Sequence, residues 1–292
     1  MTKKLNFLAA TTLLGGSLLF TSTPVWAQTQ PQSPISSVSN TSSYNWAGYV
    51  AANGSYTSIT GTWIIPQVTS GNSLSADATW VGIGGVGSTD LIQAGTMNSS
   101  GQSQAWFETL PQAISPISLP VKAGDSITVL LDQRSAGVWN ISFNDNTTGQ
   151  NYQTSVNYNS SLSSAEWIEE MPASNFGFIP LDNFGTVQFT NSSTIQNGQP
   201  TTITGANAQM MTMVNAGREN LASPSALGAD GGSFTVTRSG ASSASSVGPG
   251  YVRRRWSHVS RDIQGYTPPA QGSTRILRFY RDGFQTLFFQ FR

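Results

Sequence analysis

The sequence predicts an all-β protein, built as an antiparallel β-sandwich or barrel. Short runs rich in β-branched and aromatic residues recur along the chain, and clusters of Gly, Asn, Ser and Pro separate them. No stretch shows a sustained helical period of apolar residues. The clearest runs cover residues 57–65, 78–83, 103–110, 126–131, 139–143, 185–190 and 234–237.

Alternating side chains support strands in the middle of the chain. Ile127, Val129 and Leu131 alternate with polar or outward positions, and residues 139–143 repeat this pattern. A period of two places successive side chains on opposite faces of a strand. The segment 143–152, FNDNTTGQNY, is rich in turn residues and predicts a connection between two such strands.

The first residues predict export. Two lysines precede an apolar run at 5–20, and small residues fit a cleavage site after Ala27. We therefore expect a signal peptide at 1–27 and a secreted, extracellular protein. A membrane-spanning helix is the alternative, but Thr, Gly and Ser interrupt the run, which is short for a bilayer. Residues 28–43, rich in Gln, Ser and Pro, predict a flexible leader or short propeptide.

Charge divides the rest of the chain into two parts. Residues 28–240 carry four Lys or Arg against twelve Asp or Glu, whereas 241–292 carry eight Arg against two Asp. We assign 44–240 to the β-sandwich domain and 241–292 to a basic C-terminal tail of low order. The tail is interpreted as a poorly structured extension, an altered reading frame at the end of the gene, or a basic appendage that binds an anionic cell surface.

Composition excludes several classes of function. The chain has no cysteine and a single histidine, His258 in the tail, so the body lacks a Ser-His-Asp triad, a Cys-His pair and a histidine zinc site. The Asp-Thr-Gly or Asp-Ser-Gly motif of pepsin-like enzymes is also missing. An acidic body disfavours nucleic-acid binding, and no later segment is apolar enough for membrane insertion. We expect a monomer with no metal and no cofactor.

What remains is carboxylate chemistry supported by a neutral amide. A glutamate, with an ordinary pKa near ~4.3, can activate water in acid, and a glutamine amide can donate to an oxyanion without titrating. Gln93 is a polar residue in the otherwise apolar segment DLIQAG, and Glu166 lies between Ala165 and Trp167. A structural glutamine and a solvated edge carboxylate are the alternatives. A period of two places Glu169 on the face of Trp167, opposite to Glu166.

Seven segments resemble, in order and spacing, those of the eqolisins, a family of glutamic peptidases. The similarity covers roughly residues 44–238. The segments are NWAGYVA (45–51), SITGTWIIP (58–66), ATWVGIGG (78–85), LIQAG (91–95), QAWFETLP (104–111), AEWIEE (165–170) and NFGTVQFTN (183–191).

The resemblance implies a sandwich of two long, bent antiparallel sheets with a substrate groove on the concave face. It also implies a secreted acid endopeptidase that hydrolyses polypeptides, with an optimum on the order of pH 2–4. The catalytic glutamine of the family falls on Gln93, and its catalytic glutamate falls on Glu166. The side chains expected to bind substrate are Trp46, Trp80, Trp106 and Glu108.

The chain departs from the family in two segments. Gly84 replaces the Asp of the family's WVGIDG, and Thr109 and Leu110 replace a Trp and a Tyr of its WYEWYP. These changes bear on substrate preference and efficiency, whereas both residues of the dyad remain. We expect Glu169 and Glu170 to be supporting or solvated carboxylates.

Two other functions are compatible with a β-sandwich. A glycoside hydrolase would use Glu108 and Glu166 as acid and base across an aromatic cleft, with Gln93 elsewhere. A carbohydrate-binding module is compatible with the eight Trp of the chain, but it would not need Gln93 beside Glu166. The relative positions of these three side chains separate the alternatives.

Overall fold

The computed structural model describes residues 41–69, 75–174, 177–240, 275–279 and 287–291. The signal peptide expected at the N-terminus, the leader up to residue 40 and His258 lie outside these residues. Every regular element within the described ranges is a β-strand. No helix in this part of the chain is therefore available to cross a membrane.

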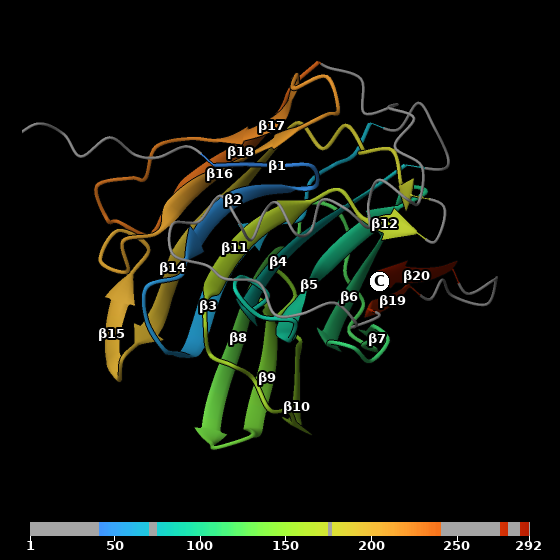
Figure 1. Ribbon diagram of the computed structural model, residues 1–292. Helices are drawn as coiled ribbons and strands as arrows, with labels where there is room; N and C mark the ends of the chain where they lie inside the picture. The colour runs from blue at the N-terminus through green and yellow to red at the C-terminus, as the bar shows by residue number, and fades with distance from the viewer. Residues whose placement is uncertain (1–40, 70–74, 175–176, 241–274, 280–286, 292) are drawn as a thin grey trace, which may run out of the picture. The chain divides into compact units, whose positions relative to one another are not determined.

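Sixteen strands join in one hydrogen-bonded sheet (Figure 1). Their order is β10-β9-β8-β3-β14-β18-β17-β16-β2-β11-β4-β5-β6-β7, with β1 parallel to β16 and β15 antiparallel to β14. The bounds are β1 Thr41–Ser43, β2 Trp46–Ala51, β3 Tyr56–Ile64, β4 Ala76–Gly84, β5 Leu91–Ser99, β6 Gln102–Thr109, β7 Ser115–Pro116, β8 Ser126–Ser135, β9 Val138–Asp145, β10 Asn151–Asn157, β11 Ala165–Glu170, β14 Thr186–Gln196, β15 Gln199–Thr202, β16 Gln209–Val214, β17 Asn220–Pro224 and β18 Phe234–Arg238. Two short pairs are separate: β12 Ala173–Ser174 with β13 Gly177–Phe178, and β19 Arg275–Phe279 with β20 Leu287–Phe291.

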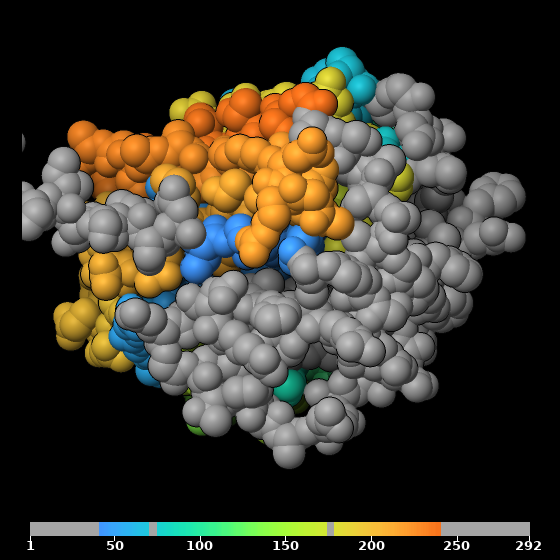
Figure 2. All heavy atoms as spheres, turned by 45° about the horizontal axis from the view of Figure 1, so that its top comes forward, coloured from blue at the N-terminus to red at the C-terminus, as the bar shows by residue number. Residues whose placement is uncertain are grey.

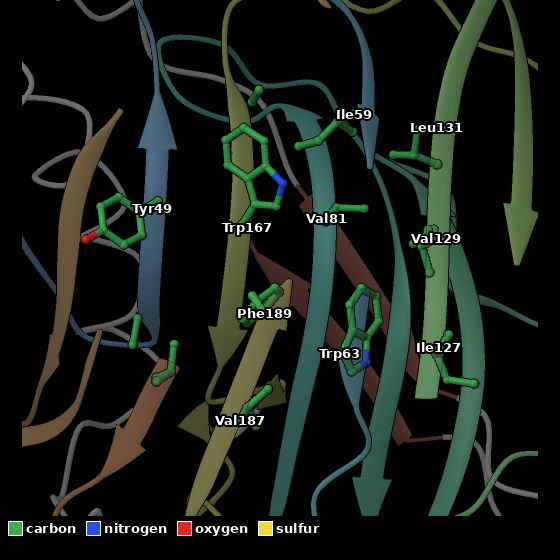
Figure 3. Close-up of a cluster of buried hydrophobic side chains, with 14 of the residues drawn as sticks. Tyr49, Ile59, Trp63, Val81, Ile127, Val129, Leu131, Trp167, Val187 and Phe189 are labelled. Atoms are coloured by element: carbon green, nitrogen blue, oxygen red, sulfur yellow. The ribbon is translucent and has the colours of Figure 1, made fainter. Parts of the chain in front are cut away.

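The long sheet folds over so that its two halves pack face to face, which confirms the antiparallel β-sandwich expected from the sequence. One half contains β3, β8, β9 and β14, and the other contains β2, β11, β4 and β5. Figure 3 shows the core between them, where Trp63 and Phe189 of the first half meet Val81 and Trp167 of the second. The two expected sheets are thus halves of one ladder, joined through β18, β17 and β16.

The connection between the halves brings the beginning and the end of the domain together. On the face shown in Figure 2, residues of β1 and β2 (blue) lie beside the β16–β18 region (orange). β1 occupies the last three residues of the segment expected to be a leader, so regular structure begins earlier than the sequence indicated. β19 and β20 form an antiparallel pair within the tail that we expected to have low order.

Two tryptophans tie the halves of the sandwich together by hydrogen bonds as well as by packing. The indole nitrogen of Trp167 donates to the carbonyl oxygen of Thr60 at 2.9 Å, and that of Trp63 donates to the hydroxyl of Thr96 at 2.8 Å. Both rings are buried. A buried N–H without a partner would destabilise the core, so these bonds fix how the rings lie between the layers.

The second half carries another apolar cluster on the side facing away from the core. In β2, Trp46 and Val50 belong to this cluster, whereas Ala47 and Tyr49 point into the core. This is the period-two alternation of a strand. We call this side the outer face and define it by Trp46, Val50, Ala78, Trp80, Leu91, Met97, Trp106, Leu110 and Ile168.

Truncation of Trp167 tests the core. Trp167→Ala removes a fully buried ring and leaves the Thr60 carbonyl without its partner. We expect the free energy of unfolding at pH 4, measured by urea titration, to fall by about 3–5 kcal/mol. Ile64→Ala is the matched control, because Ile64 is 50% exposed and its loss should change stability by less than about 0.5 kcal/mol. Equal effects of the two substitutions would contradict this description of the core.

Candidate active site

Gln93 and Glu166 lie in one row that runs across the outer face. Gln93 on β5 is paired with Gly82 on β4, and Gly82 is paired with Glu166 on β11. Residues directly opposite in a sheet project to the same face. The two side chains therefore share the outer face, two strand spacings or about 10 Å apart at their Cα atoms.

Glycine at position 82 contributes no side chain to this row, and the side chains of its neighbours pack over its Cα atom. A Cβ atom on Gly82 would lie 2.9 Å from the ring of Trp80 and 3.0 Å from Cδ1 of Leu91. Contacts this short require the neighbours to move, so a larger residue is disfavoured. Gly82 thus lets Trp80 and Leu91 pack closely against the sheet between Gln93 and Glu166.

The amide of Gln93 is held by Glu108. Gln93 Nε2 donates to Glu108 Oε2 at 2.6 Å, and the two residues are directly opposite on β5 and β6. A primary amide carries two hydrogens, so this bond leaves the second hydrogen of Nε2 free to donate. Glu108, which we expected to bind substrate, accepts this hydrogen bond and thereby orients the Gln93 amide.

Several buried polar atoms of this row have no hydrogen-bond partner among the described residues. They are Oε1 of Gln93, Oε1 of Glu108, and both Oε1 and Oε2 of Glu166. Buried polar groups are nearly always paired in folded proteins. These unpaired acceptors on both sides of Gly82 are available to a water molecule or to a polar group of a ligand.

Burial sets the protonation of the two glutamates. It raises the pKa of Glu166 well above 4.5, and the nearby charge of Asp90 adds to the increase, while the Ser164 hydroxyl opposes it. Burial also raises the pKa of Glu108 well above 4.5, partly offset by the hydrogen bond from Gln93. Desolvation penalises the charged form, so both carboxyl groups are predominantly neutral at strongly acidic pH.

Glu170 lies two residues beyond Ile168 on the same face. It fixes the position of the tryptophan side chains that lie beside the polar row. Its carboxylate accepts hydrogen bonds from Trp80 Nε1 at 2.8 Å and from Asn45 Nδ2 at 2.9 Å. Trp80 packs edge-to-face against Trp46, with ring centroids 5.2 Å apart. Burial raises the pKa of Glu170 to about 7, which its hydrogen bonds partly offset.

The aromatic residues expected at the site are all on the outer face, but they are buried within its apolar cluster. Trp46, Trp80 and Trp106 have exposed fractions of 2% or less. They pack beside the row of polar residues and shape its surroundings. Sequence reasoning did not assign the role of Glu170, although the period of two from Glu166 places it on this face.

Glu169 lies on the opposite side of β11, in the sandwich core, as its spacing from Trp167 indicates. It accepts a hydrogen bond from the Thr79 hydroxyl at 2.6 Å and interacts with Asp77. Burial raises the pKa of Asp77 to about 8, and the charge of Asp182 adds to the increase. Neither Glu169 nor Glu170 is solvated, which corrects that part of the expectation.

The departures noted in the sequence have local explanations. Gly84 has a positive φ of 93°, and a Cβ there would lie 2.7 Å from the carbonyl oxygen of Asp90, so the backbone requires glycine. Leu110 is buried in the cluster of the outer face, and its carbonyl accepts a hydrogen bond from the Tyr158 hydroxyl at 2.7 Å. Thr109 and Leu110 also line a polar cavity of about 510 Å³.

The order of the row separates the alternative functions. Glu108 and Glu166 are three strand spacings apart, about 14 Å at their Cα atoms. Gln93 lies between them and not elsewhere, which disfavours the glycosidase. No group of three or more ligand-type residues suited to a metal ion occurs in the described ranges.

Comparison of the sequence with known proteins identifies a peptidase family and two related peptidases. A family model described as "Peptidase A4 family" matches residues 44–238. Aspergillopepsin-2 of Aspergillus niger is 31% identical over 157 residues, covering 44% of this chain and 56% of the relative. Scytalidopepsin B of Scytalidium lignicola is 30% identical over 133 residues, covering 43% and 51%. The chain thus spans about half the length of these curated relatives.

The structure is also similar in fold to solved structures of glutamic peptidases. A scytalido-glutamic peptidase with a transition state analog inhibitor has a TM-score of 0.60 at 24% identity, covering 67% of this chain and 98% of that one. Aspergilloglutamic peptidase from Aspergillus niger has a TM-score of 0.51 at 27% identity, covering 56% and 99%. The β-sandwich described above is the fold of these proteins.

Buried neutral carboxyl groups make the stability of the domain depend on pH. Their folded pKa values are raised, so their contribution is complete below the ordinary values of 4.5 for Glu170 and 3.8 for Asp77. It is lost as pH rises through about 7 for Glu170 and about 8 for Asp77. We expect the free energy of unfolding, measured by urea titration, to fall steadily from pH 4 to pH 8.

Asp77→Asn keeps the shape and an acceptor for Asn98, which donates to Asp77 at 3.1 Å, but it cannot ionise. The variant should therefore lose less stability than the wild-type protein between pH 4 and pH 8. A wild-type protein that is equally stable at both pH values would contradict the raised pKa values.

Proposed function

The chain belongs to the peptidase A4 family, and from this premise we propose that it is a glutamic endopeptidase that hydrolyses peptide bonds in acid. In this proposal Glu166 is the general base that activates water, and Gln93 is the donor to the oxyanion. We also propose that the protein is secreted, because its first residues have the pattern of a signal peptide.

The observation that supports this function best is the row Gln93–Gly82–Glu166 on one face of the sheet. A base and an oxyanion donor must reach the same scissile carbonyl from different sides. In this row the two side chains project to the same face from strands on either side of β4. The unpaired oxygens of Glu166 and the second amide hydrogen of Gln93 are available to a water molecule and to that carbonyl.

The reaction begins with water bound against Glu166. The ionised carboxylate takes a proton from this water while the water oxygen bonds to the carbonyl carbon of the substrate. The carbonyl oxygen becomes an oxyanion on the side of Gln93, and the amide hydrogen of Gln93 stabilises the developing charge. The protonated Glu166 then gives its proton to the leaving nitrogen as the C–N bond breaks, which regenerates the carboxylate.

Glu108 acts as a positioning residue in this scheme. Its hydrogen bond to Gln93 Nε2 uses one of the two amide hydrogens and prevents the amide from rotating. The other hydrogen is thereby kept pointing in one direction. A donor held in place before the reaction stabilises an oxyanion without reorganisation.

The buried carboxyl groups limit the pH range of activity at its acidic end and at its alkaline end. Because the pKa of Glu166 is raised well above 4.5, the base is ionised only at higher pH than an exposed glutamate would be. Ionisation of Glu170 near pH 7 and Asp77 near pH 8 destabilises the fold at the upper end. We therefore propose an optimum at mildly acidic pH, above the range that the family resemblance implies.

Substitution of the two dyad residues tests the proposed function. Glu166→Gln keeps the size of the side chain but removes the base, and turnover of an acid-denatured protein should fall by about 10²–10⁴-fold. Gln93→Ala removes the oxyanion donor and should reduce turnover by about 10²–10³-fold. Glu219→Gln is the control, since this glutamate is exposed and pairs with Asn215 far along the chain from the row. Wild-type turnover in Glu166→Gln would refute the assignment.

Substitution of Glu108 tests its positioning role separately. Glu108→Leu fills the buried site but leaves the Gln93 amide without its partner. We expect kcat to fall by about 10- to 100-fold, since a misdirected donor affects the transition state, while KM changes little. A rise in KM with unchanged kcat would instead restore Glu108 as a substrate-binding residue.

A further inference from the structure

The polar row of the outer face continues beyond Glu166. Glu166 is paired with Val50 on β2, and Val50 is paired with Gln209, the first residue of β16. Gln209 is therefore two strand spacings from Glu166, as Gln93 is on the other side. Figure 1 shows β16, β2, β11, β4 and β5 side by side in this order.

The side chain of Gln209 belongs to the outer face. Its neighbours Ala208 and Met210 pack against the sandwich core, and Met211 belongs to the outer cluster. Alternation along the strand places Gln209 with Met211. Val50, directly opposite, is also a member of the outer cluster.

Gln209 has no structural task within the described residues. It is half-buried, and its side chain makes no hydrogen bond to them. Gln104, another glutamine of this half of the sheet, differs, because it donates to the carbonyl oxygens of Ala105 and Ile117. An amide among apolar neighbours with free donors and acceptors is suited to pair with the main chain of a bound peptide.

We propose that Gln209 binds the main chain of the peptide substrate on the side of Glu166 that is remote from Gln93. This inference rests on the proposed peptidase function. It assigns to Gln209 a role in setting the length of the peptide that the site binds. The distance from Glu166 is about 10 Å at the Cα atoms, and an extended peptide advances about 3.3 Å per residue. Gln209 thus contacts the substrate about three residues from the scissile bond. Its amide does not titrate, so the contact is kept throughout the acid range.

The experiment uses the full chain and a nested set of peptides that contain one cleaved bond and are trimmed residue by residue from either end. For the wild-type enzyme, kcat/KM should rise when the residue about three positions from that bond is added on one side. Gln209→Ala should abolish this rise, lowering kcat/KM by about 3- to 10-fold for extended peptides only, mainly through KM. Peptides too short to reach Gln209 should be cleaved at the wild-type rate.

Two further variants separate binding from structure. Gln209→Glu should keep the advantage of extended peptides at acid pH, where the neutral carboxyl both donates and accepts. Gln188→Ala removes an exposed glutamine of β14 in the other half of the sheet and should affect no peptide. Equal losses on short and extended peptides in Gln209→Ala, or no loss on either, would overturn the proposal.

The same assay distinguishes failure of this inference from failure of the proposed function. If Glu166→Gln cleaves short peptides as the wild-type enzyme does, the dyad itself is wrong. If Glu166→Gln is inactive while Gln209→Ala matches wild type on every peptide, the dyad stands and only the role of Gln209 is wrong.

Discussion

The burial of carboxyl groups without cationic partners is the constraint on which the rest of this structure depends. The groups that hold their pKa values down are neutral donors such as the Thr79 hydroxyl, the Trp80 indole and the Gln93 amide, and none is a Lys or Arg. Desolvation prevails in each case, so the carboxyl groups keep their protons in acid. The carboxyl groups concerned are Asp77, Glu108, Glu166, Glu169 and Glu170. The same constraint predicts that a body with twelve acidic and four basic residues is more stable in acid than at neutral pH.

Strand β11 shows how one segment serves both sides of the sandwich. Trp167 and Glu169 point into the core, where one bonds to Thr60 and the other to Thr79. Glu166 and Glu170 point to the outer face, where Glu170 accepts a hydrogen bond from Trp80 and Glu166 lies near the Ser164 hydroxyl. Packing on both faces fixes the register of the strand. Once β11 is paired with β4, packing on both faces therefore keeps Glu166 opposite Gly82.

The sequence was sufficient for the all-β class and for the faces of β11, because both follow from periods of two along the chain. It also contained a local signal for the pairing of Gln93 with Glu108. The tight turn at Ser100 and Gly101 pairs Ser99 with Gln102, and counting back along both strands places Gln93 opposite Glu108.

The placement of Glu166 opposite Gly82 had no local signal, because β4 and β11 are far apart in the sequence and only the complete sheet brings them together. The bond from Asn45 to Glu170 was unpredictable for the same reason. The strands at Thr41–Ser43 and in the tail show that a polar or basic composition alone does not define the limits of regular structure.

The proposed role of Glu166 as general base requires that its buried carboxyl group ionise, although burial favours the neutral form. The most direct measurement is the titration of its carboxyl group, taken as the infrared difference between wild type and Glu166→Gln, beside the pH profile of kcat/KM. The account predicts that Glu166 titrates above pH 4.5 and that the acid limb of the profile has the same pKa. Titration at or below the ordinary value, or an acid limb at a different pH, would contradict it.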